Sequence, residues 1–364
     1  MRPPLSLAGV ASPRVRAHIN GVTIDSVTHF NIVAGGSCRS SRCDLTLRVP
    51  ESAGTALWLD PAIRTVRISI FVRFDKSNEE VGLFEGIADL VEFDPIKNLA
   101  RIRGRDYSAI LMSSSNQEAF CNQTASEIAE TIAIRHGFNT NIVKTITLVG
   151  SQSNEDHDQM LLNSYSQFTS EWDLLTHMAQ IERFELYFEG STLNFAPRSA
   201  LTRGFHVLRR DDVRELRFRK SCSPAPQTSI VIKSWDTWLD QSSESTSNLE
   251  GGQTGFSAIG SIGAQPIEYV LVKPNLGEAD LERLGAAYSA TMSEQSLVVD
   301  IVAPGWAGLR TYDIVTLQGL FAGFDKEYLI RSARWSFSAT TGFLQYVRGH
   351  AVRSDSFFWL NMEL

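Results

Sequence analysis

Residues 81–105 read VGLFEGIADLVEFDPIKNLARIRGR, and this stretch contains the plainest strand signals of the chain. Two strand-like runs, 81–93 and 99–103, flank the segment Asp94–Asn98. Asp, Pro and Asn are typical turn residues, because they preset or tolerate the backbone angles that a reversal needs. The stretch therefore predicts a β-hairpin.

Further strands are predicted on the N-terminal side of this hairpin. Apolar and polar residues alternate over 14–22, 43–49 and 65–74, and 22–33 fits a return strand after Asn20-Gly21. Asn-Gly is a strong hairpin signal, because both residues accept a positive φ. Short strands at regular spacing predict a β-barrel or sandwich over residues 1–115.

The hydrophobic period then changes to that of helices. Thr124 to Glu127 forms a capping box and Gly137 supplies a stop, so a helix is predicted between them. A second helix is predicted from Ser170, which has Asp173 three positions later. A hairpin over 184–195 completes a small α/β domain, predicted for residues 116–205.

Strands are predicted again over residues 206–350, which we expect to form a second β-module. Within it, residues 241–265 are rich in Ser, Gly, Thr and Gln, and predict a flexible loop. Residues 351–364 form an apolar tail that needs a docking partner. Phe357, Phe358 and Trp359 are the candidate subunit-interface residues.

A weak internal repeat links the two β-rich regions. Arg64-Thr65 precedes one predicted strand and Arg310-Thr311 another, at an offset of 310 − 64 = 246. The segments ending at Gly104 and Gly349 match at an offset of 349 − 104 = 245. These matches suggest that one β-module occurs twice, so the predicted fold is mixed and mainly β, with an α/β insert.

Composition excludes several classes of function. The 34 Lys and Arg residues against 41 Asp and Glu residues give a net charge of −7, with no long basic run. Sequence-specific nucleic-acid binding is therefore not expected. No apolar run reaches the ~18 residues that cross a bilayer, so no membrane insertion is expected. The N-terminus also lacks a secretory signal, which predicts folding in a cytoplasm.

The sequence gives little support for catalysis, a cofactor or a metal site. The HExxH, GxSxG, Walker A and GxGxxG patterns are absent. The cluster Glu155–Asp158 is expected to be a solvated loop, and His136 a helix-end residue. Glu85 and Asp89 could serve as a glycosidase pair. The four cysteines lack metal spacing and are expected to be reduced thiols, although Cys38 and Cys43 could form a surface crosslink.

Several segments, in order along the chain, resemble the tail hub family of phages and contractile injection systems, also called baseplate hub or late control D proteins. The segments that carry the resemblance are Gly86–Glu92, the family-like GRD-SALL segment at Arg103–Leu111, the TASEIA-like helix at Thr124–Phe138, the unit from Trp172 through Phe184 to Phe195, and the closing module from Pro304 to Phe343. Arg183 stands where the family usually has Gly, so a different turn is expected there.

The resemblance implies a structural virion protein and not an enzyme. It implies a homotrimer in which two tube-like β-barrel modules per chain adapt a hexameric tail tube to a trimeric spike. The implied partners are the tail tube or a distal tail protein, a separate spike protein, and possible tape measure and baseplate wedge proteins. The implied location is the virion tail, assembled in the host cytoplasm, where the hub plugs or lines the end of the DNA channel.

Two alternatives remain open from the sequence. A tail-associated cell-wall hydrolase predicts a cleft with a carboxyl group of raised pKa. A host-glycan-binding module predicts exposed aromatic residues, with Trp235, Trp238 and Trp306 as the candidates.

Overall fold

The computed structural model describes residues 13–49, 57–74, 80–115, 120, 123–146, 170–201, 204–220, 228–236, 241–249, 267–272, 281, 282, 285, 288, 297–304, 308–320 and 323–352. They divide into two compact units. The larger unit draws on Met1–Leu216, Ile301–Asp325 and Leu329–Arg348. The smaller unit draws on Arg217–Asp300, Lys326–Tyr328 and Gly349–Leu364.

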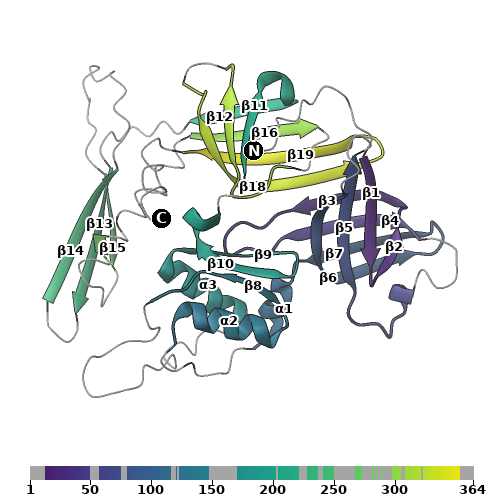
Figure 1. Ribbon diagram of the computed structural model, residues 1–364, viewed down its shortest axis with the longest axis horizontal. Helices are drawn as coiled ribbons and strands as arrows, with labels where there is room; N and C mark the ends of the chain where they lie inside the picture. The colour runs from purple at the N-terminus through teal and green to yellow at the C-terminus, as the bar shows by residue number, and fades with distance from the viewer. Residues whose placement is uncertain are drawn as a thin grey trace. The chain divides into compact units, whose positions relative to one another are not determined.

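The first β-module is an antiparallel sheet with the strand order β3-β4-β7-β6-β5-β1-β2 (Figure 1). Its strands are β1 (Pro13–Ile19), β2 (Val22–Ile24), β3 (Val27–Val33), β4 (Arg42–Arg48), β5 (Arg67–Phe74), β6 (Glu80–Asp94) and β7 (Leu99–Arg105). A short 3₁₀ helix, η1 (Leu57–Leu59), lies between β4 and β5.

Both predicted turns of this module are confirmed, but the single return strand predicted over 22–33 is wrong, because only Val22–Ile24 pairs with β1 and Val27–Val33 is a separate strand that pairs with β4. Asn20 and Gly21 have φ angles of 48° and 83°, as a tight turn between β1 and β2 requires. In the turn between β6 and β7, Asp94 Oδ1 accepts hydrogen bonds from the backbone nitrogens of Ile96 at 3.0 Å and Lys97 at 3.1 Å. The alternating residues face one core, in which Ile68, Ile70, Leu45, Leu47 and Ile102 are fully buried.

The α/β insert packs helices α2 (Ala125–Arg135) and α3 (Glu171–Glu182) on the sheet β8-β10-β9 (Figure 1). The sheet strands are β8 (Asn139–Ile142), β9 (Phe184–Glu189) and β10 (Thr192–Pro197), and helix α1 (Ser108–Ser113) precedes them. The predicted capping box is present, since Thr124 accepts from the Glu127 nitrogen and Glu127 accepts from the Thr124 nitrogen. Ser170 caps α3 as predicted.

The second set of strands follows the order β12-β16-β19-β18-β17-β11. These are β11 (Phe205–Arg209), β12 (Glu215–Lys220), β16 (Leu297–Pro304), β17 (Ile314–Gln318), β18 (Glu327–Ser338) and β19 (Gly342–Ala351). Strands that the sequence repeat relates, β5 with β17 and β7 with β19, hold corresponding places in the two paths. The copies differ at one end, because β1 runs antiparallel to β5 while β11 runs parallel to β17.

The prediction of a flexible loop over 241–265 is wrong for its first nine residues. They form strand β14 (Gln241–Leu249), which pairs along its whole length with β13 (Thr228–Asp236). A polar edge strand needs no apolar face of its own, because backbone hydrogen bonds to β13 hold it while side chains such as Ser242 and Thr246 remain exposed to water. Strand β15 (Ile267–Val272) pairs with the other edge of β13. Residues 250–265 lie outside the described part of the chain.

None of the helices in the described ranges has the length and apolar character that crossing a membrane requires.

Candidate functional site

The two β-modules meet at an antiparallel joint between β3 and the end of β18 (Figure 1). Arg334–Ser338 pair with His29–Val33, so the sheet continues from one module into the other. On the core face, Phe337 lies opposite Phe30 with ring centroids 5.7 Å apart, and Trp335 lies opposite Ile32. On the other face, Arg334 Nε donates to Asn31 Oδ1 at 2.6 Å.

A second contact in the larger unit centres on the buried carboxylate of Glu185, on β9. Its Oε1 lies 3.1 Å from Arg198 Nε and 3.4 Å from Arg331 Nη1. Its Oε2 accepts a hydrogen bond from the Tyr312 hydroxyl at 3.2 Å. We call Glu185, Arg198, Arg331 and Tyr312 the Glu185 cluster, and it ties the α/β insert to the second β-module.

The surroundings of Glu185 favour its charged form. Burial acts to raise the pKa of this carboxyl group, but the hydrogen bond from Ser37 and the charges of Arg198 and Arg331 together hold the pKa below its usual value. A general acid needs the opposite shift. The cluster is therefore suited to holding a fixed negative charge between two cations.

Tyr312 reaches Glu185 from a strained backbone. Its φ angle is 73°, a region that non-glycine residues rarely adopt, and its side chain is buried. The backbone nitrogen of Tyr312 donates to the Ile330 carbonyl at 2.9 Å, and its ring lies 5.1 Å from that of Tyr187. Burial is the first cause that raises the pKa of the Tyr312 hydroxyl, followed by the charge of Glu185.

The loop between β3 and β4 also contacts the insert. The Cys38 nitrogen donates to the Leu186 carbonyl at 2.8 Å. Gly35 cannot be replaced without a rearrangement, because an added Cβ would lie 2.1 Å from the Arg39 carbonyl oxygen. The buried Asp106 accepts from Ser40 Oγ at 2.9 Å and the Ser41 nitrogen at 2.6 Å.

Cys38 and Cys43 are free thiols in this loop and at its end. Burial raises the pKa of both, so both favour the unreactive thiol form. The reduced state of the cysteines stays a prediction, and Cys121 and Cys222 lie outside the described residues.

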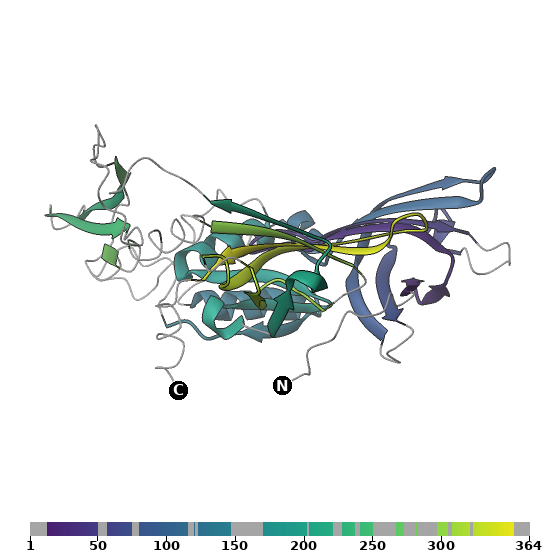
Figure 2. The same cartoon turned by 90° about the horizontal axis from the view of Figure 1, so that it is seen from above.

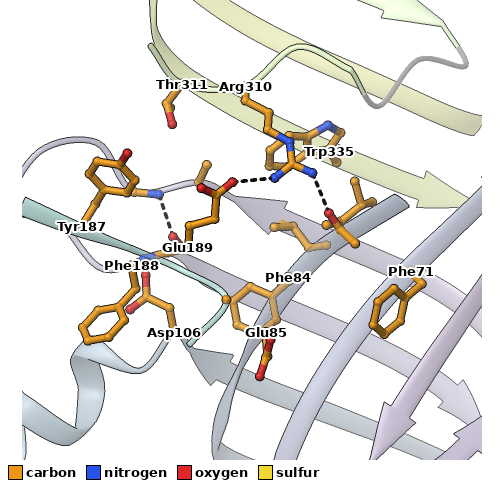
Figure 3. Close-up of a pocket in the computed structure, with 17 residues that line it drawn as sticks. Phe71, Phe84, Glu85, Asp106, Tyr187, Phe188, Glu189, Arg310, Thr311 and Trp335 are labelled. Atoms are coloured by element: carbon orange, nitrogen blue, oxygen red, sulfur yellow. Dashed lines mark hydrogen bonds and ion pairs between the residues drawn. The ribbon is translucent and has the colours of Figure 1, made fainter. Parts of the chain in front are cut away.

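A pocket of about 310 Å³ lies beside these contacts (Figure 3). Its walls come from both β-modules and the insert, and include Phe71, Phe84, Glu85, Tyr187 and Trp335. Arg310 lies at this pocket, where its guanidinium donates to Glu189 Oε1 at 2.9 Å and to the Gly82 carbonyl at 3.0 Å. Arg310 therefore connects the insert to the first module.

Glu85 and Asp89, the pair weighed for glycoside hydrolysis, have separate partners. Glu85 Oε1 accepts from the Tyr107 hydroxyl at 2.9 Å, and burial, followed by this hydrogen bond, raises the pKa of Tyr107 to about 12. Asp89 forms a bidentate pair with Arg105, with both N···O distances at 2.7 Å. Both carboxylates therefore have partners of their own within the chain.

The remaining candidates from the sequence fall in three places. Two predictions fall outside the described residues: the subunit-interface candidates Phe357, Phe358 and Trp359, and the acidic cluster 155–158. His136 ends α2 and its Nε2 lies 2.6 Å from Glu171 Oε2, so it pairs with the start of α3. Within the described ranges, no group of three or more metal-ligating side chains is found. Trp235 is 48% exposed on β13, while Trp238 and Trp306 are outside the described part.

Sequence reasoning did not identify the Glu185 cluster. A signal was present, because Glu185 is the charged residue inside the run Phe184–Phe188, where its four neighbours are apolar or aromatic. A charge in such a run requires a partner. Its partners, however, lie 127 positions away at Tyr312 and 146 at Arg331.

Comparison with known proteins finds likeness in structure and not in sequence. No protein-family model and no curated protein sequence matches the chain. Among solved structures, the prophage MuSo2 43 kDa tail protein from Shewanella oneidensis has a TM-score of 0.64 at 18% identity. The alignment covers 95% of this chain and 99% of that one.

A tail protein from Neisseria meningitidis MC58 has a TM-score of 0.65 at 13% identity, with 93% of this chain and 96% of that chain covered. This chain has the fold of a phage tail protein. The E. coli c3393 protein, a component of the type VI secretion system, shares the tail-protein fold with a TM-score of 0.56 at 13% identity, and 93% of this chain and 77% of that chain are covered. The resemblance noted in the sequence is thus confirmed for the fold, which is mainly β.

Proposed function

We propose that this chain is a structural subunit of a phage tail or a related injection machine, the homotrimeric hub between the tail tube and the spike. The observation that carries the proposal is the β3–β18 joint. It connects two sets of strands with the same order into one continuous sheet. A chain that already places two β-modules edge to edge supplies two of the six positions of a hexameric ring.

A ring of three such chains would match a six-fold tail tube on one side, through its six β-modules, and a three-fold spike on the other. An interface that uses two different surfaces closes into a ring when the rotation between copies divides a full turn. A ring of three chains would present six β-modules toward a tail tube or distal tail protein. It would present three copies of every other element toward a separate spike.

The proposal includes the further partners and the location. The tape measure and baseplate wedge proteins would contact the assembled hub in the virion tail, after assembly in the host cytoplasm. A chain of the Francisella PdpA-VgrG complex shares the fold at a TM-score of 0.57 and 9% identity, with 94% of this chain and 58% of that chain covered, which supports a role within a multiprotein assembly. The hub would line or plug the end of the DNA channel, where the net charge of −7 disfavours binding of DNA.

The proposal treats the chain as structural and not catalytic. The low pKa of Glu185 and the separate partners of Glu85 and Asp89 favour this over the cell-wall hydrolase. Cell-wall lysis by the purified protein would contradict the structural role, and glycan binding by it would favour the host-recognition alternative.

The decisive experiment measures the mass and symmetry of the purified full chain. Mass photometry should give a species of three times 40.4 kDa. Electron microscopy should show rings with a central hole and three-fold symmetry that approaches six-fold. Monomers at every concentration, with and without added tail tube or spike protein, would overturn the proposal.

A further inference from the structure

Four neighbouring strands of the continuous sheet carry arginines on the face opposite the hydrophobic core. The strands lie in the order β18-β3-β4-β7, and Figure 2 shows β18 (yellow) beside the purple strands of the first module. Buried and outward residues alternate along β4 and β7, so every second side chain points away from the core. We call the exposed outward arginines of these strands the basic face: Arg42, Arg48, Arg101, Arg103 and Arg334.

Acidic residues do not balance the basic face. Asp44 Oδ1 lies 3.6 Å from Arg103 Nε, and Glu92 of the adjoining strand β6 lies opposite Arg101 in the ladder. Five arginines against these two carboxylates give a charge of 5 − 2 = +3. Since the whole chain has a net charge of −7, the other residues sum to −7 − 3 = −10. This face therefore has the opposite sign to the rest of the chain.

Neighbouring arginines at this face repel one another. Arg42 lies directly opposite Arg105, whose guanidinium is already paired with Asp89 and is therefore left out of the basic face. Like charges in opposite positions destabilise a sheet. Arg101 and Arg103 point the same way from one strand, at a backbone spacing of about 7 Å. An anionic partner that bridges these side chains would relieve the repulsion.

The guanidinium groups keep hydrogen-bond donors for such a partner. Among the described residues, Arg42, Arg48 and Arg101 have no ion-pair partner. Arg334 uses its Nε for Asn31, which leaves its two Nη groups as donors. All basic side chains of this face are arginines, and a planar guanidinium can donate two parallel hydrogen bonds to one phosphate group.

We propose that the basic face binds the phosphate backbone of DNA without reading its sequence. The inference goes beyond the proposed function because it assigns a ligand to one face of the chain. The choice of DNA among polyanions rests on that function, which puts the chain at a DNA channel. Contacts to phosphate carry no sequence information, so this binding agrees with the absence of a sequence-specific site.

The contact should be weak and sensitive to salt. The −10 of the remaining residues repels DNA, while counterion release from the phosphates favours binding to the arginines. Added salt reduces both terms, but it removes the gain from counterion release most strongly. Such a contact guides DNA over the surface without retaining it.

The first test measures binding of the full-length protein to a labelled DNA duplex of about 20 base pairs at about 50 mM salt. The double variant Arg42→Gln and Arg101→Gln should bind roughly tenfold more weakly, because it loses two phosphate contacts. Arg64→Gln with Arg210→Gln is the matched control, since both arginines are exposed and lie outside these four strands. The control loses the same charge and should change the affinity by about twofold or less.

The second test measures how the affinity depends on salt. The slope of log Kd against log[salt] should fall by about 2 in the Arg42 and Arg101 double variant, roughly 1 for each arginine, and stay unchanged in the control. Two duplexes of equal length and different sequence should bind equally well. Both double variants should keep the thermal midpoint of the wild type within a few degrees, because the four substituted arginines are exposed.

Competition separates DNA from other anions. Polyglutamate and inorganic phosphate, added at the same concentration of negative charge as unlabelled DNA, should displace the labelled duplex far less than that DNA does. Equal displacement by polyglutamate would assign the face to an acidic protein surface, and equal displacement by inorganic phosphate would make it a general anion site. Either result would overturn the assignment to DNA.

The outcomes separate the basic face from the hub role. A wild-type trimer that does not bind DNA, or that binds equally weakly in both double variants, would overturn this inference while the hub role stands. A wild-type chain that binds DNA as expected but stays monomeric under all conditions would overturn the hub role and leave the basic face.

Discussion

The β3–β18 joint and the Glu185 cluster both connect parts of the larger unit that are far apart in sequence, but they use different interactions. The joint uses backbone hydrogen bonds and facing rings, so its strength varies gradually with the area buried. The cluster uses one buried carboxylate against two guanidinium groups and a hydroxyl. Loss of Glu185 leaves two partly buried guanidinium groups and the buried Tyr312 hydroxyl without their shared partner.

Because they use different interactions, the two contacts should lose different amounts of stability when one residue is substituted. An apolar joint tolerates partial loss, because the remaining strand pairs still form. A buried charge cluster is sensitive to single changes, because desolvated charges are costly when unpaired. The following substitutions test this difference, beginning with the largest expected effect.

Glu185→Ala should destabilise the protein by about 2–3 kcal/mol, because the buried Tyr312 hydroxyl loses its acceptor, while Arg198 and Arg331 lose their shared partner but remain 35% and 25% exposed to water. The measurement is the free energy of unfolding from urea denaturation. Asp89→Ala removes a carboxylate from an exposed ion pair and serves as the control, with an expected loss of about 1 kcal/mol or less. Equal losses in the two variants would show that the buried Glu185 contributes no more than an exposed ion pair.

Phe337→Ala should cost about 2 kcal/mol, because it removes a partly buried ring from the β3–β18 joint while the backbone pairing remains. Phe337→Leu keeps much of the apolar volume and should cost less than half as much. A loss larger than that of Glu185→Ala would reverse the ranking of the two contacts.

Acid should weaken the cluster and leave the joint unaffected. The folded-state pKa of Glu185 is lowered from its usual 4.5, so its contribution is fully present above that value and is lost as pH falls through the folded pKa. We expect the stability of the wild type to fall more steeply below pH 4.5 than that of Glu185→Gln. Parallel curves for the two proteins would show that Glu185 does not titrate as inferred.

Ser170→Ala should cost about 1 kcal/mol, because it removes the cap of α3, the helix that leads into β9 and Glu185. The loss should be similar at neutral and acidic pH, since the cap does not depend on Glu185. Ser170→Thr, which keeps the capping hydroxyl, should recover most of the stability.

Arg183→Gly should give the smallest effect, a gain of about 0.5–1 kcal/mol. Arg183 ends α3 with a φ angle of 58°, which glycine adopts without the cost paid by other residues. Arg183→Ala removes the same side chain without this freedom and should not stabilise the protein. A gain in both variants would assign the effect to the side chain and not to the backbone.

Local features of the fold could be predicted from the sequence, and contacts between distant segments could not. The hairpin of β6 and β7, the capping box at Thr124 and the cap at Ser170 all depend on residues within a few positions of one another. The strand β14 was missed because its polar composition resembles a linker, and only its partner β13 makes it a strand. The contact between Glu185 and Tyr312 was missed because the two residues are more than 100 positions apart, and no local pattern shows which distant residue will pair with a buried charge.

The separation of the two strands in the joint affects how the chain is made. Ile32 pairs with Trp335, so 335 − 32 = 303 residues of synthesis separate them. At a synthesis rate of roughly 5–20 residues per second, the edge of β3 stays unpaired for about 15–60 s before the ribosome has made its partner strand β18. During that time neighbouring nascent chains on one message can present the same open edge. Translation speed and chaperone binding to β3 should therefore influence the yield of correctly folded protein.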